Sequence, residues 1–530
     1  MADPTPLLCQ SNTSSDTEPP PSSPNKQHLP SLGSTIEKVI GDFNWTQFLQ
    51  ALLVSSAWVF DAQQTFITVF TDAHPPWHCT QQQDAGAAES CSTSNNMCTL
   101  EKTSWAWDRP TSSSIISEWG LECASPVMTG LPASLFFMGC LVGGLVLATL
   151  ADTSLGRKNM LFFSCLMMSL SSLLASFSSN IWIYSSLKFL SGFGRATIGT
   201  SSLVLASELV GKKRRAQISV CGFFLFTIGF LSLPAMAYIN RNSSWRNLYL
   251  WTSIPTILYC ILVKLFVQES PRWLLVRGKK EEALASLKII TSITQSNLNL
   301  AINSIFPQQE EENLNVDLFS ALNILLRKKW SCTRLLAVMS MGFGIGLVYY
   351  GMPLGLGNLS FNLYLSVTFN AVSELPSSMV VFFMIDKLRR RIALLAFTVI
   401  SGVFSVMSVM EFLSSEVQIG FELISFFSAC TSFNIYLIYT TELFPTCVRN
   451  SALSMARLAV VFGGVFSPLL VGTGGGGGSG VVCYGVFGLA IGCSGVFGVF
   501  LPETRGRAMS DTMDEEENKY KSASDFNVLA

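Results

Sequence analysis

Long apolar stretches, rather than any single motif, decide what this chain can fold into. A helix of about 20 residues spans the ~30 Å hydrocarbon core of a bilayer, and twelve apolar stretches of about that length recur along the sequence. They lie near 45–70, 126–150, 159–178, 181–209, 217–239, 247–267, 335–357, 361–385, 392–412, 418–441, 451–472 and 481–500. Only 13% of the 530 residues are charged, about half of the share usual in soluble proteins. The sequence therefore predicts an all-α integral membrane protein with twelve transmembrane helices.

The polar segment 269–333 separates the first six stretches from the last six. We therefore expect two pseudo-symmetric six-helix bundles joined by a helical insert. The expected parts are a disordered cytosolic N-terminus (1–40), an N-terminal bundle (41–268) with a cysteine-bearing extracytosolic loop (71–125), a cytosolic helical loop (269–333), a C-terminal bundle (334–505) and a cytosolic tail (506–530).

Cations in the short loops predict the orientation. The loops after even-numbered stretches carry Lys and Arg, as in 212–215 and 387–391, whereas the loops near 357–361, 413–417 and 473–480 carry none. Because cytosolic loops are enriched in these residues, we expect both termini to be cytosolic. The acidic run 514–517 is expected to be a solvated tail.

The long loop 71–125 contains four cysteines, at Cys79, Cys91, Cys98 and Cys123. Disulfides form on oxidising faces of membranes, so these residues predict two disulfides, and three pairings are open. Elsewhere, Asn242 begins an Asn-Ser-Ser glycosylation sequon in a short loop on the same side.

The N-terminal segment contains Asp3 followed by Leu7 and Leu8. This spacing fits an acidic dileucine sorting signal for an internal membrane. Chance occurrence in a disordered tail is the alternative interpretation.

Acidic and basic residues recur together at the predicted cytosolic helix ends, six helices apart, which indicates a duplicated half. A carboxylate at a helix C-terminus opposes the helix dipole, so nearby cations are needed to hold it. We expect these residues to latch neighbouring helices on the cytosolic face in one conformation. They are Asp152, Gly156, Arg157, Glu208 and Arg215 in the first half, and Asp386, Arg390, Glu442 and Arg449 in the second.

Several motifs resemble those of the major facilitator superfamily over residues 40–507. Three are shared with sugar porters: Asp152 with Gly156-Arg157-Lys158, the run 269–275 (ESPRWLL), and 502–506 (PETRG). The long cysteine loop, its closing run 117–123, and 441–450 (TELFPTCVRN) are similar to the organic cation/carnitine transporter branch, and the chain looks like its plant members. The resemblance implies the major facilitator fold, in which helices 1, 4, 7 and 10 line a central cavity.

Two charged residues fall deep inside cavity-lining stretches. Asp61 lies in the first stretch and Arg195 in the fourth, at similar depth. Ionisable residues within membranes are costly and usually face a cavity. We expect a charge pair, which is either opened by substrate or proton or is permanently structural.

Two further charges belong to the second half. Glu374 precedes Pro376 in the eighth stretch, and the resemblance implies a role in attracting or gating a cation. A structural role beside the proline is the alternative. Arg457 lies in the eleventh stretch, where relatives that carry anions or zwitterions have an Arg, but it sits about one turn nearer the cytosol. Lys188 is expected to snorkel to the outer face, and Glu422 to be a solvated residue at the outer mouth.

Aromatic residues complete the predicted binding site. Tyr349 and Tyr350 resemble the family's Tyr-x-Gly element in the seventh stretch, and Phe223 and Thr227 match family cavity positions. An aromatic face near a quaternary ammonium contributes about 0.5–2 kcal/mol through cation–π attraction.

Enzyme signatures are absent from the sequence. It has no P-loop pattern for ATP-driven pumping, and its 3 His lie outside the apolar stretches, so we expect no cofactor, no metal and no catalysis. The sequence predicts a secondary transporter that moves small organic cations or zwitterions, carnitine- or polyamine-like, by alternating access. The alternatives are an organic anion or sugar carrier and a non-transporting nutrient sensor.

The expected partners are a small-molecule substrate, a coupling proton or sodium ion, and lipid, without nucleic acid. We expect a monomer in the plasma or vacuolar membrane.

Overall fold

A computed structural model describes residues 44–80, 97–153, 155–211, 214–291, 318–359, 361–384, 387–410, 412–473, 480–506, 510 and 512–519. The sorting residues Asp3, Leu7 and Leu8, together with Cys91 and Asp386, lie outside the described residues. Within the described residues the regular structure is helical, apart from one antiparallel hairpin formed by β1 (Trp77–Cys79) and β2 (Trp105–Trp107). The predicted all-α membrane architecture is confirmed.

The N-terminal half comprises α2 (Trp45–Ser55), α3 (Ala57–Phe66), α4 (Thr68–Thr71), α6 (Ile115–Glu118), α7 (Pro126–Thr153), α8 (Arg157–Ala175), α9 (Ile181–Arg195), α10 (Ile198–Glu208), α11 (Arg215–Ile239) and α12 (Trp245–Phe266). In the described part of the connection to the second half there are three helices: α13 (Pro271–Val276), α14 (Lys280–Ile290) and α16 (Leu318–Arg327). The C-terminal half comprises α17 (Lys329–Gly355), α18 (Leu363–Met384), α19 (Arg390–Met407), α20 (Ser415–Leu443), α21 (Arg449–Gly472) and α22 (Gly480–Val496).

Ten of the described helices are long and apolar enough to cross a membrane. The other two predicted spans, near 45–70 and 181–209, are chains of shorter helices. The first is divided at Ser56 and Ile67, and the fourth at Ala196 and Thr197. Hydropathy does not reveal these interruptions, because the residues that make them are as compatible with a helix as their neighbours.

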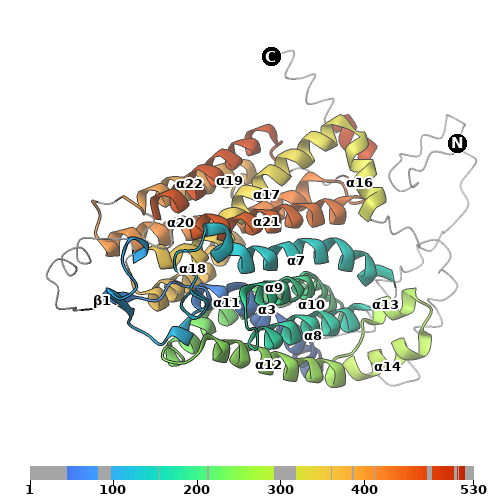
Figure 1. Ribbon diagram of the computed structural model, residues 1–530. Coiled ribbons are helices and arrows are strands. Elements are labelled where there is room, and N and C mark those ends of the chain that lie inside the picture. The colour runs from blue at the N-terminus through green and yellow to red at the C-terminus, as the bar shows by residue number, and fades with distance from the viewer. Residues whose placement is uncertain are drawn as a thin grey trace, which may run out of the picture.

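The two halves lie side by side, with α7 of the first half against α21 of the second (Figure 1). Glycine allows this approach. A Cβ on Gly130 would lie 2.6 Å from the carbonyl oxygen of Pro468, and one on Gly472 would lie 2.7 Å from that of Pro126. The hairpin and α6 lie at one end of the molecule, the loop end, and α13, α14 and α16 lie at the other, the basal end (Figure 1).

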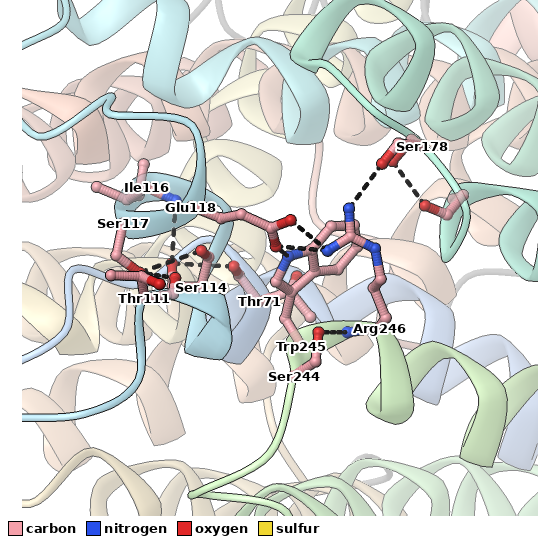
Figure 2. A network of polar contacts seen from close by, with 11 residues as sticks. Thr71, Thr111, Ser114, Ile116, Ser117, Glu118, Ser178, Ser244, Trp245 and Arg246 are labelled. Carbon is pink, nitrogen blue, oxygen red and sulfur yellow. Dashed lines mark hydrogen bonds and ion pairs between the residues drawn. The ribbon is translucent and has the colours of Figure 1, made fainter.

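At the loop end, the long loop is fastened to the N-terminal half (Figure 2). Glu118 at the end of α6 accepts hydrogen bonds from the indole Nε1 of Trp245, at 2.6 Å, and from the Arg246 guanidinium, while Arg246 also donates to the carbonyl of Ser178. The structure joins Cys98 to Cys123 in a disulfide, and Cys79 is disulfide-bonded as well. The sequon residue Asn242 is exposed in the turn before α12.

At the basal end, the repeated motifs form helix caps that sequence reasoning missed. Glu269 accepts from the backbone N–H groups of Arg157 (3.0 Å) and Lys158 (3.1 Å) at the start of α8. Gly156 has φ +80°, and a Cβ there would lie against the Glu269 carboxylate. Burial raises the pKa of Glu269, although these backbone hydrogen bonds oppose the rise.

The second half repeats this cap. Glu503 accepts from the backbone N–H groups of Arg390 (2.9 Å) and Arg391 (3.3 Å) at the start of α19. The Arg390 guanidinium pairs with Glu442 at 3.2 Å and so joins α19 to α20. The shared geometry supports an internal duplication.

The remaining expected latch residues have separate partners. Arg215 donates to the Ser207 carbonyl (3.0 Å) and Arg449 to that of Phe444 (3.4 Å), while Glu208 Oε2 is buried without a hydrogen bond among the described residues. The side chain of Asp152 lies outside the described part of the chain. A conformation-dependent latch of neighbouring helices on the cytosolic face stays a prediction.

The acidic tail is docked, so its assignment as solvated was wrong. Lys328, just before α17, bonds Asp514 and Glu517 at 2.6 Å each, and Arg334 bonds Glu516 at 2.7 Å. Burial lowers the pKa of Lys328, but its hydrogen bonds to the two carboxylates outweigh that effect and the net pKa is raised. The tail therefore holds the base of the C-terminal half.

Candidate functional site

The first component of the site is the predicted charge pair. Arg195 Nε lies 2.7 Å from Asp61 Oδ1, and its second terminal nitrogen lies 3.3 Å from Oδ2. Asp61 is 3% exposed. The interaction is bidentate, the geometry in which a guanidinium binds a carboxylate most strongly. The structure thus brings together two residues 134 positions apart in sequence.

Both members of the pair lie in interrupted spans. Asp61 is on the short helix α3, and Arg195 is the last residue of α9, directly before the break at Thr197. The Thr197 hydroxyl lies 2.7 Å from that of Ser164 on α8, so the break is tied to a neighbouring helix.

Lys188 does not snorkel to the outer face, and that expectation was wrong. Its side chain is completely buried, with Nζ 4.6 Å from the centre of the Phe136 ring and 5.5 Å from that of Tyr249. Its ammonium has no hydrogen-bond partner among the described residues. The α9 face that carries Lys188 packs against α7, and this packing prevents the side chain from reaching the membrane surface.

The second component lies in the C-terminal half, around Tyr349. Its hydroxyl donates to Glu374 Oε1 at 2.8 Å. Its ring stacks on Phe433 of α20, with centroids 4.9 Å apart and planes at 14°, and on Phe426 at 6.2 Å. Thr227 of α11, in the other half, lies beside Glu374. Among the described residues, no Lys or Arg forms an ion pair with this carboxylate.

Tyr350 connects the two components. Its ring lies 4.6 Å from that of Phe137 on α7 and 6.0 Å from the Arg195 guanidinium. Arg457 of α21 interacts electrostatically with the same tyrosine and forms no ion pair in the described part of the chain. Adjacent residues of α17 therefore face two environments, an acidic one at Tyr349 and a basic one at Tyr350.

Phe223 packs outside the acidic component, and its predicted place in the cavity lining stays a prediction. Its ring packs on Trp58 at 5.8 Å and is 40% exposed. Thr227, one turn along α11, is buried and donates to the Phe223 carbonyl. Of these two α11 residues, the structure brings only Thr227 to the acidic component.

The position of Glu422 differs from the one that the sequence predicts. Glu422 is fully buried on α20, rather than solvated at a mouth, and accepts a 3.0 Å hydrogen bond from Asn370 of α18. The first seven residues of α20 precede Glu422, so it lies about two turns into the helix. An earlier predicted start for this helix would have revealed that depth.

One described pocket lies between the halves at the loop end. Its volume is about 70 Å³, and its lining includes Asp72, His74, Asn358 and Pro468. Such a volume holds several water molecules. Burial lowers the pKa of His74, which favours its neutral form.

Near this pocket Tyr364 joins the halves. It stacks on Phe70 at 5.6 Å, meets Tyr238 edge-on at 5.5 Å, and accepts from Arg109 of the long loop at 2.8 Å. These contacts close the loop end.

Two bundles with paired repeats, interrupted helices and charged residues at mid-depth define the class of secondary membrane transporters. The family described as sugar (and other) transporters matches residues 58–514. Organic cation/carnitine transporter 3 of Arabidopsis thaliana is 58% identical over 98% of both chains, and human organic cation/carnitine transporter 2 is 30% identical over 76% of this chain and 72% of its own. The E. coli xylose transporter XylE, in an inward-open form, has a TM-score of 0.62 at 17% identity, covering 87% of this chain and 98% of its own.

The chain therefore belongs to the sugar (and other) transporter family of the major facilitator superfamily, in its organic cation/carnitine transporter branch. It is a multi-pass membrane transporter and not an enzyme.

Proposed function

We propose that this transporter moves small organic cations or zwitterions by alternating access, and that Glu374 with Tyr349 binds the positive group. The observation that carries the proposal is the buried Glu374 carboxylate, which bonds Tyr349 but forms no ion pair among the described residues. A carboxylate in a low-dielectric site attracts a cation strongly because water does not screen it. The Tyr349, Phe426 and Phe433 rings add cation–π attraction of about 0.5–2 kcal/mol.

Asp61 is less suited to this role. Arg195 already neutralises it through two hydrogen bonds, so a cationic substrate would have to displace a guanidinium. The permanent structural interpretation of the pair fits this geometry better than the interpretation in which substrate opens it.

Arg457 favours a zwitterion as one substrate class. It forms no ion pair among the described residues and lies within electrostatic reach of Tyr350, the neighbour of the tyrosine that bonds Glu374. A molecule with an ammonium and a carboxylate a few bonds apart would complement both ends. Relatives named for carnitine as well as organic cations agree with this assignment.

Uptake into vesicles tests the proposal. The full-length protein in proteoliposomes should accumulate labelled quaternary ammonium ions and carnitine at a set pH and potential, and should not accumulate hexoses or simple carboxylates. Accumulation of a sugar or an anion alone would favour the other carriers of this superfamily. Binding without accumulation of any substrate would favour a sensor.

We further propose that the basal end faces the cytosol, since the short-loop cations lie there, and that the protein works as a monomer in the plasma or vacuolar membrane. A fluorescent tag on the C-terminus, read with a membrane-impermeant quencher, reports the side. Imaging of the tagged protein, with and without Leu7 and Leu8, reports the membrane.

A further inference from the structure

Glu422 and Asn370 form a polar pair that the proposed substrate site does not use. Both side chains are completely buried, and Asn370 Nδ2 donates to Glu422 Oε1 at 3.0 Å. The other oxygen of each, Glu422 Oε2 and Asn370 Oδ1, is buried without a hydrogen-bond donor among the described residues. The pair thus has one satisfied contact and two acceptor oxygens with nothing to accept from.

An ionised Glu422 does not fit these surroundings. An unpaired charge in a protein interior costs several kcal/mol, and each unsatisfied polar atom costs about 1–3 kcal/mol. A proton on Oε2 removes the charge and converts this oxygen into a donor. A carboxylic acid can then form two parallel hydrogen bonds with an amide, N–H to Oε1 and O–H to Oδ1. One O–H would therefore satisfy both vacant oxygens, which favours a proton over a metal ion that needs several ligands.

The groups that face Glu422 do not supply a counter-charge. Glu374 on α18 lies one turn from Asn370, Cys430 on α20 interacts electrostatically with both acids, and Tyr484 on α22 interacts with Glu422. On α17, Tyr349 bonds Glu374. Helix α19 contributes the hydroxyl of Ser401, which bonds Ser425 of α20. None of these described groups is a cation.

We propose that Glu422, positioned by Asn370, is a proton-binding site that couples a proton gradient to substrate movement. The inference rests on the proposed transport function and adds the identity of the coupling ion. Asn370 and Glu374 are four residues apart, about 6 Å along α18, and Cys430 interacts electrostatically with both acids, so Glu422 lies close to the proposed cation site. Two nearby carboxylates resist being ionised together, and a proton on Glu422 therefore favours an ionised Glu374 that is ready to bind a cation. On release, the O–H bond breaks and the proton passes to water.

Two transport assays on the same proteoliposomes test this site. Exchange of labelled against unlabelled quaternary ammonium without a pH gradient measures substrate movement, and accumulation driven by an imposed pH gradient measures coupling. Glu422→Gln keeps the shape and an amide pair but binds no proton. This variant should retain exchange, but its accumulation in the pH gradient should fall at least about tenfold, equivalent to about 1.4 kcal/mol. Glu422→Asp should retain accumulation with a shifted pH dependence.

Glu416→Gln is the matched control, because Glu416 lies on the same helix but is exposed. It should leave both activities unchanged. If Glu422→Gln accumulates substrate in a pH gradient at the wild-type level, the proton site is overturned. Accumulation by the wild type that follows a sodium gradient instead of a pH gradient would also overturn it. Absence of exchange in the wild type would overturn the proposed function.

A spectroscopic measurement tests the proton site independently of transport. The infrared difference spectrum of the purified protein between acid and alkaline buffer should contain the carbonyl bands of protonated carboxyl groups, and Glu422→Gln should remove one component of them. An unchanged spectrum in this variant would contradict the assignment.

Discussion

The two halves of the molecule treat the carboxylates deep in their membrane-spanning helices differently. In the first half, Asp61 meets Arg195 in a bidentate ion pair, and both residues lie on interrupted helices. In the second half, Glu374 and Glu422 lie on the long helices α18 and α20, and their described partners, Tyr349 and Asn370, are neutral. The first half supplies its own counter-charge. In the second half, we propose that what the transporter carries supplies the counter-charge, a cationic group at Glu374 and a proton at Glu422.

Removing one member of the N-terminal pair should have the largest effect. Arg195→Leu leaves Asp61 buried without its cation, and breaking a buried pair costs about 3–5 kcal/mol. We expect a large loss of thermal stability in detergent, measured by fluorescence-detected size-exclusion chromatography after heating. The exchanged pair Asp61→Arg with Arg195→Asp should recover part of it.

Glu374→Gln provides the contrast from the second half. Since Glu374 has no described cationic partner, this variant should be at least as stable as the wild type. Stability losses of equal size in Arg195→Leu and Glu374→Gln would show that the halves do not differ in the way described.

Substitutions of Tyr349 should separate two smaller contributions. Tyr349→Phe removes the hydrogen bond to Glu374, and a bond to a charged group contributes about 1.5–3 kcal/mol. Tyr349→Leu also removes the aromatic face, a further ~0.5–2 kcal/mol for a quaternary ammonium. The apparent affinity in uptake assays should therefore fall in the order wild type, Phe, Leu. Equal affinities of the two variants would exclude the cation–π contribution.

Substitutions in the helix caps of the two halves should have the smallest effects on stability. Loss of a capping side chain costs about 1 kcal/mol, so Glu269→Gln and Glu503→Gln, which keep one acceptor oxygen, should each cost less. Burial raises the pKa of Glu269. A raised folded-state pKa means that the stability from this carboxyl is fully present below its unfolded pKa and is lost as pH rises through the folded value.

Thermal unfolding across acid to neutral pH measures this effect. The stability of the wild type relative to Glu269→Gln should be greatest at acid pH and should decline toward neutral pH. A relative stability that increases with pH would contradict the burial of this carboxyl.

The sequence predicted the helices closely, since each apolar stretch corresponds to a helix or a chain of helices. It also predicted the contact between Asp61 and Arg195, because two intramembrane charges at similar depth need partners. It did not predict the interruption beside Thr197, whose hydroxyl contacts that of Ser164.

The errors at Glu422 and Lys188 share one cause. The position of each in its apolar stretch indicates a place near a membrane surface, but each is fully buried. An apolar stretch gives depth along a helix only approximately and does not reveal the helix face, which decides burial. The docked tail was missed for a related reason: an acidic run looks solvated unless the cations that receive it, here Lys328 and Arg334, are known to lie nearby.

Equilibrium binding of a labelled quaternary ammonium ion to the purified protein in nanodiscs tests the central claim most directly. Three proteins are compared: the wild type, Glu374→Gln, and the neutralised pair Asp61→Asn with Arg195→Gln, which preserves net charge. If the second half holds the cation, Glu374→Gln should lose at least about tenfold in affinity, and the neutralised pair should bind like the wild type. Wild-type affinity in Glu374→Gln, together with loss of binding in the neutralised pair, would assign the cation to Asp61 and contradict the account.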